Sequence, residues 1–342
     1  MAVRLLLSDF TDRDHHYDFT LENMLTRKLM FRFDLKLIPK SFICPFSTKR
    51  SSSINDFNLN NTELKFKKPV DVKFSPQFQC LIISDENGLY FLNHKNASLM
   101  KFVAGKDFGS LCVDYCASDC GKSKDYLIVT TQFITTQIRK YDLEKILFHF
   151  NDQLWRSGFE WSNSQLCRMS GIAFSRRNAK SGSLFVSDWT YCYMLNAGNG
   201  KVVTRFHIFD SSLQYEMRRP IHGIEFYKGN LWLVETTNDI CHIHQFKWEN
   251  SKWNNFKIHQ FKCKGATCRD IKVINEKYLA ISDSKGRILL FDLVDFKFLR
   301  KSQITSQDKI TMDVGLQGIC FNPLLNEMYA CDFETDKVHI IL

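Results

Sequence analysis

The sequence predicts an all-β protein built as a six-bladed β-propeller, and two regularities lead to this prediction. The first is an apolar run that ends in a short polar residue and then an acid, and that returns along the chain. The acids are Asp85, Asp188, Glu235, Asp283 and Asp332, and Thr131 ends the run LIVTT that fills the one gap. Successive members lie 46 to 57 residues apart, a regular period typical of repeat architectures.

The second regularity is a set of three β-rich segments that accompanies each run, except in the last repeat, where only two accompany it. A segment such as PVDVKF or SGIAF precedes the run, and segments such as LYFLN and LMKFV follow it. Turn residues such as Asn87-Gly88 and Lys285-Gly286 separate the segments, which is typical of antiparallel hairpins. In the second repeat we assign the fourth strand to ILFHF, residues 146–150. Four strands per period describe one propeller blade.

The last repeat ends at Leu342 after three strands. The segment TELKFKK, residues 62–68, stands just before the first repeat, where a fourth strand belongs. We therefore expect residues 62–68 to complete the last blade and close the ring, because closure protects the strand edges. This divides the chain into a partly flexible N-terminal extension, residues 1–60, and a propeller, residues 61–342.

The repeat resembles the NHL-repeat family, whose signature is a Gly-Ile/Val strand start, an aliphatic run ending in Val-x-Asp, and a third strand. Three repeats carry the glycine, at Gly171, Gly223 and Gly318, and three carry Asp71, Cys112 and Asp270 instead. WD40 repeats are the nearest alternative, but their Trp-Asp and Gly-His signatures are missing. The resemblance implies an NHL-type propeller that works as a non-enzymatic protein-interaction platform.

NHL propellers often occur with RING zinc fingers in ubiquitin ligases. Residues 1–60 contain one cysteine, Cys44, and so lack the paired ligands that a RING needs. We expect this chain at most to recruit a substrate to a ligase, not to transfer ubiquitin.

Composition and charge limit the classes of binding partner that we expect for this protein. The net charge is +9 and the pI about 8.9, which suits an acidic partner without identifying one. We find no run of 18 apolar residues and expect no membrane partner; we also expect no DNA partner and no cofactor. The 12 cysteines lack the dense spacing of a small secreted scaffold. Free thiols and a cytoplasmic location are the preferred interpretation.

The recurring acids have two interpretations. A carboxylate after the second strand accepts hydrogen bonds from the N–H groups of the following turn, which is a structural role. A metal or catalytic role is the alternative, and one acid per blade favours the structural role. Asp71, His222 and Asp270 are weak metal candidates, because they begin first strands, which line a propeller's central channel. Propeller lactone hydrolases and a hydroxyglycine lyase build metal sites in this region, but their full ligand sets are missing here.

Basic residues collect in the connections from a fourth strand to the next first strand. We expect them to form a basic rim on one side of the ring. The binding candidates of this rim are Lys67, Lys68, Arg168, Arg218, Arg219, Lys264 and Arg269. Such a rim suits RNA phosphates or an acidic protein segment, and a solubilising surface is the alternative.

The long spacing between the second and third repeats points to an insertion, residues 152–168. It carries Trp155, Phe159 and Trp161 among polar residues. We interpret these aromatic residues either as a plug over the ring or as an exposed contact patch for a partner.

Three functions follow, from different classes. A protein-interaction platform is the leading hypothesis. RNA binding through the basic rim is the second, and a six-bladed propeller hydrolase or lyase with an axial metal is the third.

Overall fold

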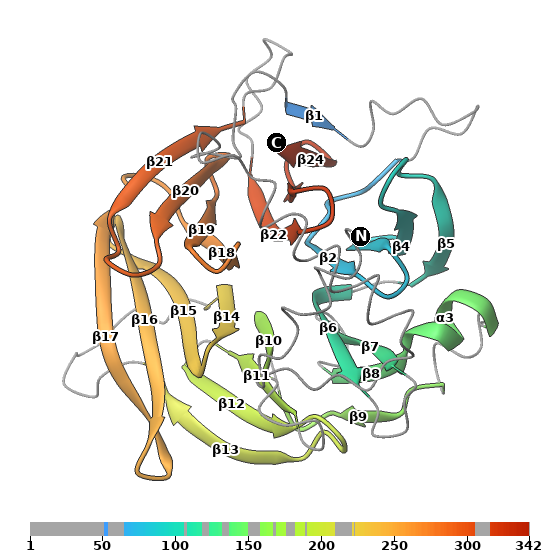
Figure 1. The fold of residues 1–342 in the computed structure, drawn as a ribbon, viewed down its shortest axis with the longest axis horizontal. Helices are drawn as coiled ribbons and strands as arrows, with labels where there is room; N and C mark the ends of the chain where they lie inside the picture. The colour runs from blue at the N-terminus through green and yellow to red at the C-terminus, as the bar shows by residue number, and fades with distance from the viewer. Residues whose placement is uncertain are drawn as a thin grey trace, which may run out of the picture.

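The computed structural model shows six four-stranded antiparallel sheets arranged as blades around a central axis (Figure 1). It describes residues 51–53, 65–105, 108–117, 123–131, 137–149, 158–166, 169–175, 182–188, 190–208, 221, 223–304 and 315–341. The chain is therefore an all-β, six-bladed β-propeller, as the repeat spacing predicts. Among these residues, no helix is long and apolar enough to cross a membrane.

The first three blades follow the chain in order, and each is built from four consecutive strands. Blade 1 holds β2 (Asp71–Ser75), β3 (Cys80–Ser84), β4 (Gly88–Asn93) and β5 (Leu99–Ala104). Blade 2 holds β6 (Phe108–Ala117), β7 (Ser123–Thr131), β8 (Gln137–Asp142) and β9 (Trp161–Asn163). Blade 3 holds β10 (Gly171–Ser175), β11 (Ser183–Ser187), β12 (Tyr191–Asn196) and β13 (Val202–His207).

Blades 4 to 6 continue the ring. Blade 4 holds β14 (Gly223–Tyr227), β15 (Asn230–Thr237), β16 (Ile240–Glu249) and β17 (Lys252–Lys262). Blade 5 holds β18 (Cys268–Ile274), β19 (Tyr278–Asp283), β20 (Arg287–Asp292) and β21 (Phe298–Gln303). Blade 6 holds β22 (Leu316–Asn322), β23 (Glu327–Asp332) and β24 (Lys337–Ile341), and β1 (Ser51–Ser53) pairs with β24.

The first strand of every blade lies nearest the axis (Figure 1). Each contacts the first strand of the next blade, and β22 contacts β2, so the inner ring is continuous. Apolar residues of neighbouring sheets form six core clusters, one at each junction between blades. The core is thus divided among the junctions, because each sheet is buried on both faces.

The segment expected to close the ring differs from the prediction. Residues 65–68 form no strand. Instead, the Lys67 N–H donates to Asp85 at 2.8 Å and the Lys68 N–H to Asp336 at 2.6 Å. Phe66 is buried in the cluster between blades 6 and 1. The strand that pairs with β24 is β1, which lies within the predicted N-terminal extension.

The fourth strand of blade 2 also differs. Most of the segment ILFHF lies in a helix, α3 (Leu143–His149), and β9 supplies the outer strand. The Asp142 carboxylate accepts the N–H groups of Glu144 at 3.1 Å and Lys145 at 3.3 Å, which caps the first turn. Leu143 and Ile146 are buried at helical spacing, so the apolar run follows a helical rather than a strand period.

Candidate functional site: the central channel

The inner strands surround a channel that opens widely at one end and narrowly at the other. The wide opening has a volume of about 550 Å³, and the narrow one about 140 Å³. Phe174, Phe226 and Phe321 line the wide opening, and each ends the recurring first segment of its repeat. Lys73 and Lys272 line both openings and mark the constriction. An opening of this size with mostly apolar walls is typical of a binding site.

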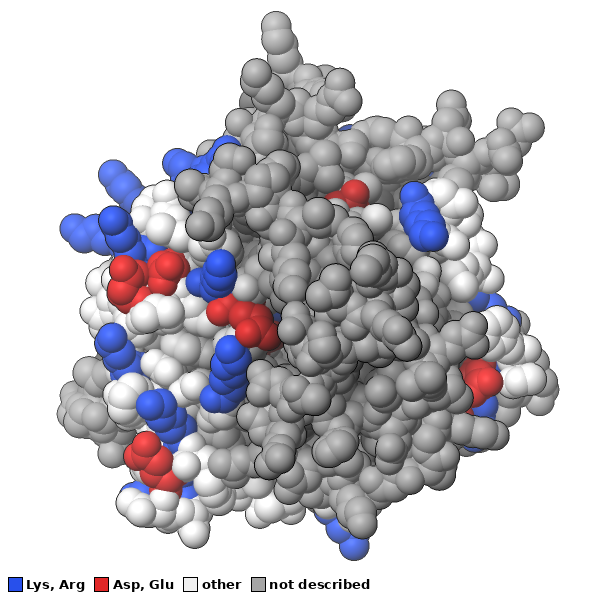
Figure 2. All heavy atoms as spheres, in the orientation of Figure 1, with Lys and Arg blue, Asp and Glu red and all other residues white. Residues whose placement is uncertain are grey.

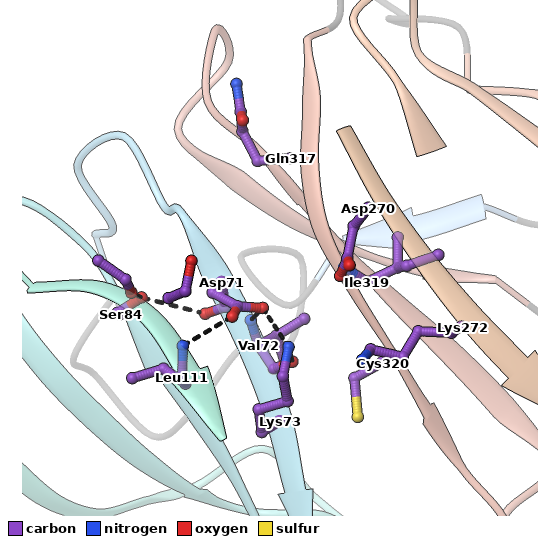
Figure 3. A network of polar contacts seen from close by, with 12 residues as sticks. Asp71, Val72, Lys73, Ser84, Leu111, Asp270, Lys272, Gln317, Ile319 and Cys320 are labelled. Atoms are coloured by element: carbon purple, nitrogen blue, oxygen red, sulfur yellow. Dashed lines mark hydrogen bonds and ion pairs between the residues drawn. The ribbon is translucent and has the colours of Figure 1, made fainter. Parts of the chain in front are cut away.

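Asp71 joins blade 1 to blade 2 at the constriction (Figure 3). Its Oδ1 accepts the Val72 N–H at 2.8 Å and also pairs with Lys73. Its Oδ2 accepts the N–H of Leu111, on the first strand of the next blade, at 2.8 Å. Both carboxylate oxygens are therefore used as acceptors inside the protein.

Asp270 repeats this arrangement between blades 5 and 6. Its Oδ1 accepts the Ile271 N–H at 2.8 Å, and its Oδ2 accepts the Ile319 N–H at 2.9 Å. Asp71 and Asp270, two of the three metal candidates, are thus bound to backbone donors. The third candidate, His222, lies outside the described residues. Among the residues that are described, no group of three His, Cys, Asp or Glu side chains could hold a metal ion.

A glycine stands beside each of these aspartates. A Cβ on Gly318 would lie 2.8 Å from the Asp71 Cα and would overlap its Oδ1. A Cβ on Gly223 would lie 2.9 Å from both the Asp270 Cα and the Ile271 nitrogen. The first-strand glycine and the first-strand aspartate therefore occur in adjacent blades for steric reasons, because only glycine leaves room for the neighbouring backbone.

Buried charges at the constriction are paired, Lys73 with Asp71 on the same strand and Lys272 with Glu225 on the first strand of the neighbouring blade. Burial, the largest single effect, lowers the pKa of Lys73, but the Asp71 carboxylate together with Asp270 and Cys320 raises the pKa above its ordinary value. In the same way, burial opposes but Glu225 and Asp270 together raise the pKa of Lys272. Burial raises the pKa of Asp270 to about 6, although Lys272 and Lys73 act in the opposite direction. Both lysines are therefore ammonium ions at neutral pH.

Sequence reasoning missed a second set of contacts between blades. The serine that precedes the acid in three of the repeats, Ser84, Ser187 and Ser282, belongs to this set. The Ser84 hydroxyl donates to the Gly109 carbonyl of blade 2 at 2.8 Å, and the Ser282 hydroxyl to the Gln317 carbonyl of blade 6 at 2.7 Å. The Ser187 hydroxyl reaches the Ile221 carbonyl, just before blade 4, at 3.1 Å. The recurrence of serine at this position was a signal in the sequence. The carbonyl that each serine contacts could not be predicted, because it belongs to the neighbouring blade.

The recurring acids accept hydrogen bonds at the turns that follow them. Asp85 accepts the N–H groups of Asn87 at 2.7 Å and Gly88 at 2.9 Å. Asp188 accepts those of Thr190 and Tyr191, Asp283 those of Lys285 and Arg287, and Asp332 those of Glu334 and Thr335. Glu235 differs, because its carboxylate contacts the rings of His242 and His244, each at 3.3 Å.

The basic rim is only partly described, since Arg168, Arg218 and Arg219 lie outside the described residues. Lys67 and Lys68 both pair with Glu86 at 3.1 Å. Lys264 is exposed, whereas Arg269 is half-buried and lines the narrow opening. On the face drawn in Figure 2, basic and acidic side chains are interspersed.

The aromatic residues of the insertion lie in the core where they are described. Trp161 is 8% exposed, and its indole N–H donates to the Ala197 carbonyl of blade 3 at 3.0 Å. Phe159 is half-buried and makes an edge contact with Tyr141, with ring centroids 6.3 Å apart. Neither side chain is placed as a plug or as an exposed contact patch, because the insertion supplies the outer strand of blade 2. Trp155 lies outside the described residues.

Comparison with known proteins supports the fold and goes no further. No family model matches the chain, and no curated protein matches it in sequence. A solved structure of the Cps50 (Swd1) β-propeller domain from Myceliophteria thermophila aligns with a TM-score of 0.53 at 10% identity, covering 82% of this chain and 98% of that one. BamB from Moraxella catarrhalis aligns with a TM-score of 0.44 at 14% identity, covering 79% and 83%. The first likeness shows the β-propeller fold alone.

Proposed function

We propose that this protein is a non-enzymatic protein-interaction platform that binds its partner at the wide opening of the central channel. The observation that carries this proposal is the opening itself, a hollow of about 550 Å³ walled by aromatic and apolar side chains. Rings such as Phe174 and Phe321 give a partner large, rigid contact surfaces, which is typical of interface anchors.

The hydrogen bonds of the constriction favour binding over catalysis. A metal-dependent hydrolase or lyase would need free acidic ligands near the axis. The carboxylate oxygens of Asp71 and Asp270 instead accept hydrogen bonds from backbone N–H groups, including those of Leu111 and Ile319 in the next blades. Freeing either carboxylate would leave buried donors unpaired, at a cost of roughly 1–3 kcal/mol each.

Finer features of the proposal rest on the sequence. We propose that the blades are of NHL type and that β1 closes the ring through its pairing with β24. The described cysteines are free and buried, which supports a reducing, cytoplasmic location. Recruitment of a substrate to a ubiquitin ligase is one use of such a platform, and in that use the chain contributes binding alone.

The proposal can be tested by affinity purification from native lysate with paired variants. Phe321→Ala removes an aromatic ring from the wide opening, and Phe298→Ala removes a 52% exposed ring from outer strand β21 as the control. We expect recovery of a defined protein partner to fall at least fivefold for the first variant only. Melting temperatures verify that both variants are folded.

RNase treatment separates this function from RNA binding through the basic rim. We expect partner recovery to survive RNase, because the contact is with protein. Loss of the partner after RNase, or equal recovery by the wild type and Phe321→Ala, would contradict the proposal.

A further inference from the structure

Three phenylalanines line the wide opening without being fully buried. Phe174, Phe226 and Phe321 lie on the inner strands β10, β14 and β22, and all three are half-buried. Phe74, which ends the same segment in blade 1, is only 3% exposed. The strands that carry Phe174 and Phe226 contact each other, so these two rings belong to neighbouring blades. The three phenylalanines therefore keep accessible surface that a guest in the opening can cover.

Contacts behind the wall fix two of these rings. Phe226 stacks on the buried Phe185, with ring centroids 5.3 Å apart and an interplanar angle of 6°. Trp253 meets both of these rings at nearly a right angle. Phe174 packs directly on Gly182, where an added Cβ would lie 2.2 Å from a carbon of the ring. Because both rings are held in place before a guest arrives, binding costs less conformational entropy.

The charged side chains that line the wide opening are already paired within the protein. Lys272 pairs with Glu225, and Lys228 pairs with Glu276 at 3.0 Å. The third lysine of this lining, Lys73, pairs with an aspartate of the narrow opening. A charged guest would lose its hydration without meeting an unpaired charge of opposite sign among these residues, which is unfavourable. The lining therefore favours an uncharged guest.

We propose that the wide opening binds an uncharged aromatic side chain of the partner protein, which packs against the rings of Phe174 and Phe226. This inference rests on the proposed function and specifies the chemistry of the same site. An aliphatic guest gains only from leaving water. An aromatic guest gains in addition from ring-to-ring contacts, because the negative face of one ring attracts the positive edge of another.

The test compares four probes, the N-acetyl amides of phenylalanine, leucine, arginine and glutamate. Saturation-transfer NMR titrations with the full chain give the dissociation constant of each probe. We expect the phenylalanine probe to bind at least twofold more tightly than the leucine probe and at least fivefold more tightly than either charged probe. No saturable binding of the phenylalanine probe, or equal binding of the leucine probe or of a charged probe, would overturn the proposal.

Two matched variants locate the probe. Phe226→Leu replaces a ring of the opening by an apolar side chain, and Phe298→Leu makes the same change on outer strand β21. We expect the affinity for the phenylalanine probe to fall at least threefold in the first variant and to stay unchanged in the second. An equal effect of both variants would contradict the placement in the wide opening. The wild-type comparison of the four probes stands even if Phe226→Leu is unstable.

This outcome is separate from that of the proposed function. If the phenylalanine probe fails but Phe321→Ala still loses the protein partner, the platform stands and the aromatic guest is wrong. If Phe321→Ala loses nothing, the platform itself fails, whatever the probes show.

Discussion

The hydroxyl of Ser84 in blade 1 donates to the carbonyl oxygen of Gly109 in blade 2 at 2.8 Å. Ser84 is the short polar residue before the recurring acid Asp85, and it is fully buried. The same position in blade 5, Ser282, makes the same bond to the Gln317 carbonyl of blade 6 at 2.7 Å. In these two repeats one serine therefore both ends a strand of its own blade and contacts the neighbouring blade.

Removing this hydroxyl should weaken the junction between blades 1 and 2. Ser84→Ala leaves the buried Gly109 carbonyl without its donor, so we expect a loss of about 1–3 kcal/mol in the free energy of unfolding. Urea unfolding measures the change. Ser302→Ala, a serine on outer strand β21, serves as the control and should change stability by less than about 0.5 kcal/mol. Equal stability of the two variants would show that the hydrogen bond between Ser84 and Gly109 does not contribute to the free energy of unfolding.

Adding a methyl group at Gly318 should strain the junction between blades 6 and 1. The new Cβ would lie 2.8 Å from the Asp71 Cα, which belongs to backbone that cannot move freely. We expect Gly318→Ala to cost about 1–3 kcal/mol, as overpacking of a core does. The control is Gly198→Ala in an exposed turn, where the nearest atom is the Asn196 Oδ1 at 3.1 Å. Thermal unfolding that finds Gly318→Ala as stable as this control would contradict the steric argument.

Stability in acid should depend on Glu235. Burial alone would raise the pKa of this carboxyl, but the neighbouring rings of His242 and His244 lower it from 4.5 to about 2. Because the folded pKa is the lower one, the carboxylate stabilises the fold above pH 4.5, and this contribution is lost as the pH falls toward 2. The contribution amounts to about 3 kcal/mol.

Glu235→Gln should therefore unfold with a flatter dependence on pH between 4.5 and 2 than the wild type. Denaturant titrations at several pH values give this dependence. Glu249→Gln, on the exposed end of the β16–β17 hairpin, should run parallel to the wild type. A wild-type profile as flat as that of Glu235→Gln would mean that the histidine contacts do not lower the pKa of Glu235.

The blades could be predicted from the sequence because every repeat except the last contains all four of its strands. The alternation of β-rich runs and turns is a local signal, so it located all the first, second and third strands. The strand that pairs with β24 was not predicted, because Ser51–Ser53 is a short polar run with no apolar pattern, whereas TELKFKK alternates like a strand. The assignment of ILFHF to a strand was wrong because a five-residue apolar run fits either a strand or a helix. Asp142 was the available capping signal.

The site was less predictable, because it depends on contacts between repeats. The structural role of the recurring acids could be predicted, because each acid precedes a turn whose N–H groups need an acceptor. Asp71 and Leu111 lie 40 residues apart, and only the ring brings the first strands of two blades together.

The most direct test of the platform is site-specific photo-cross-linking in cells. A benzoylphenylalanine replaces Lys228, which is exposed at the lip of the wide opening, or Lys301, which is exposed on outer strand β21. We predict that the Lys228 position cross-links to a discrete protein partner, unaffected by RNase, and that the Lys301 position does not. Cross-linking from Lys301 alone, or RNase-sensitive cross-links from Lys228, would contradict a protein-binding role for the channel opening.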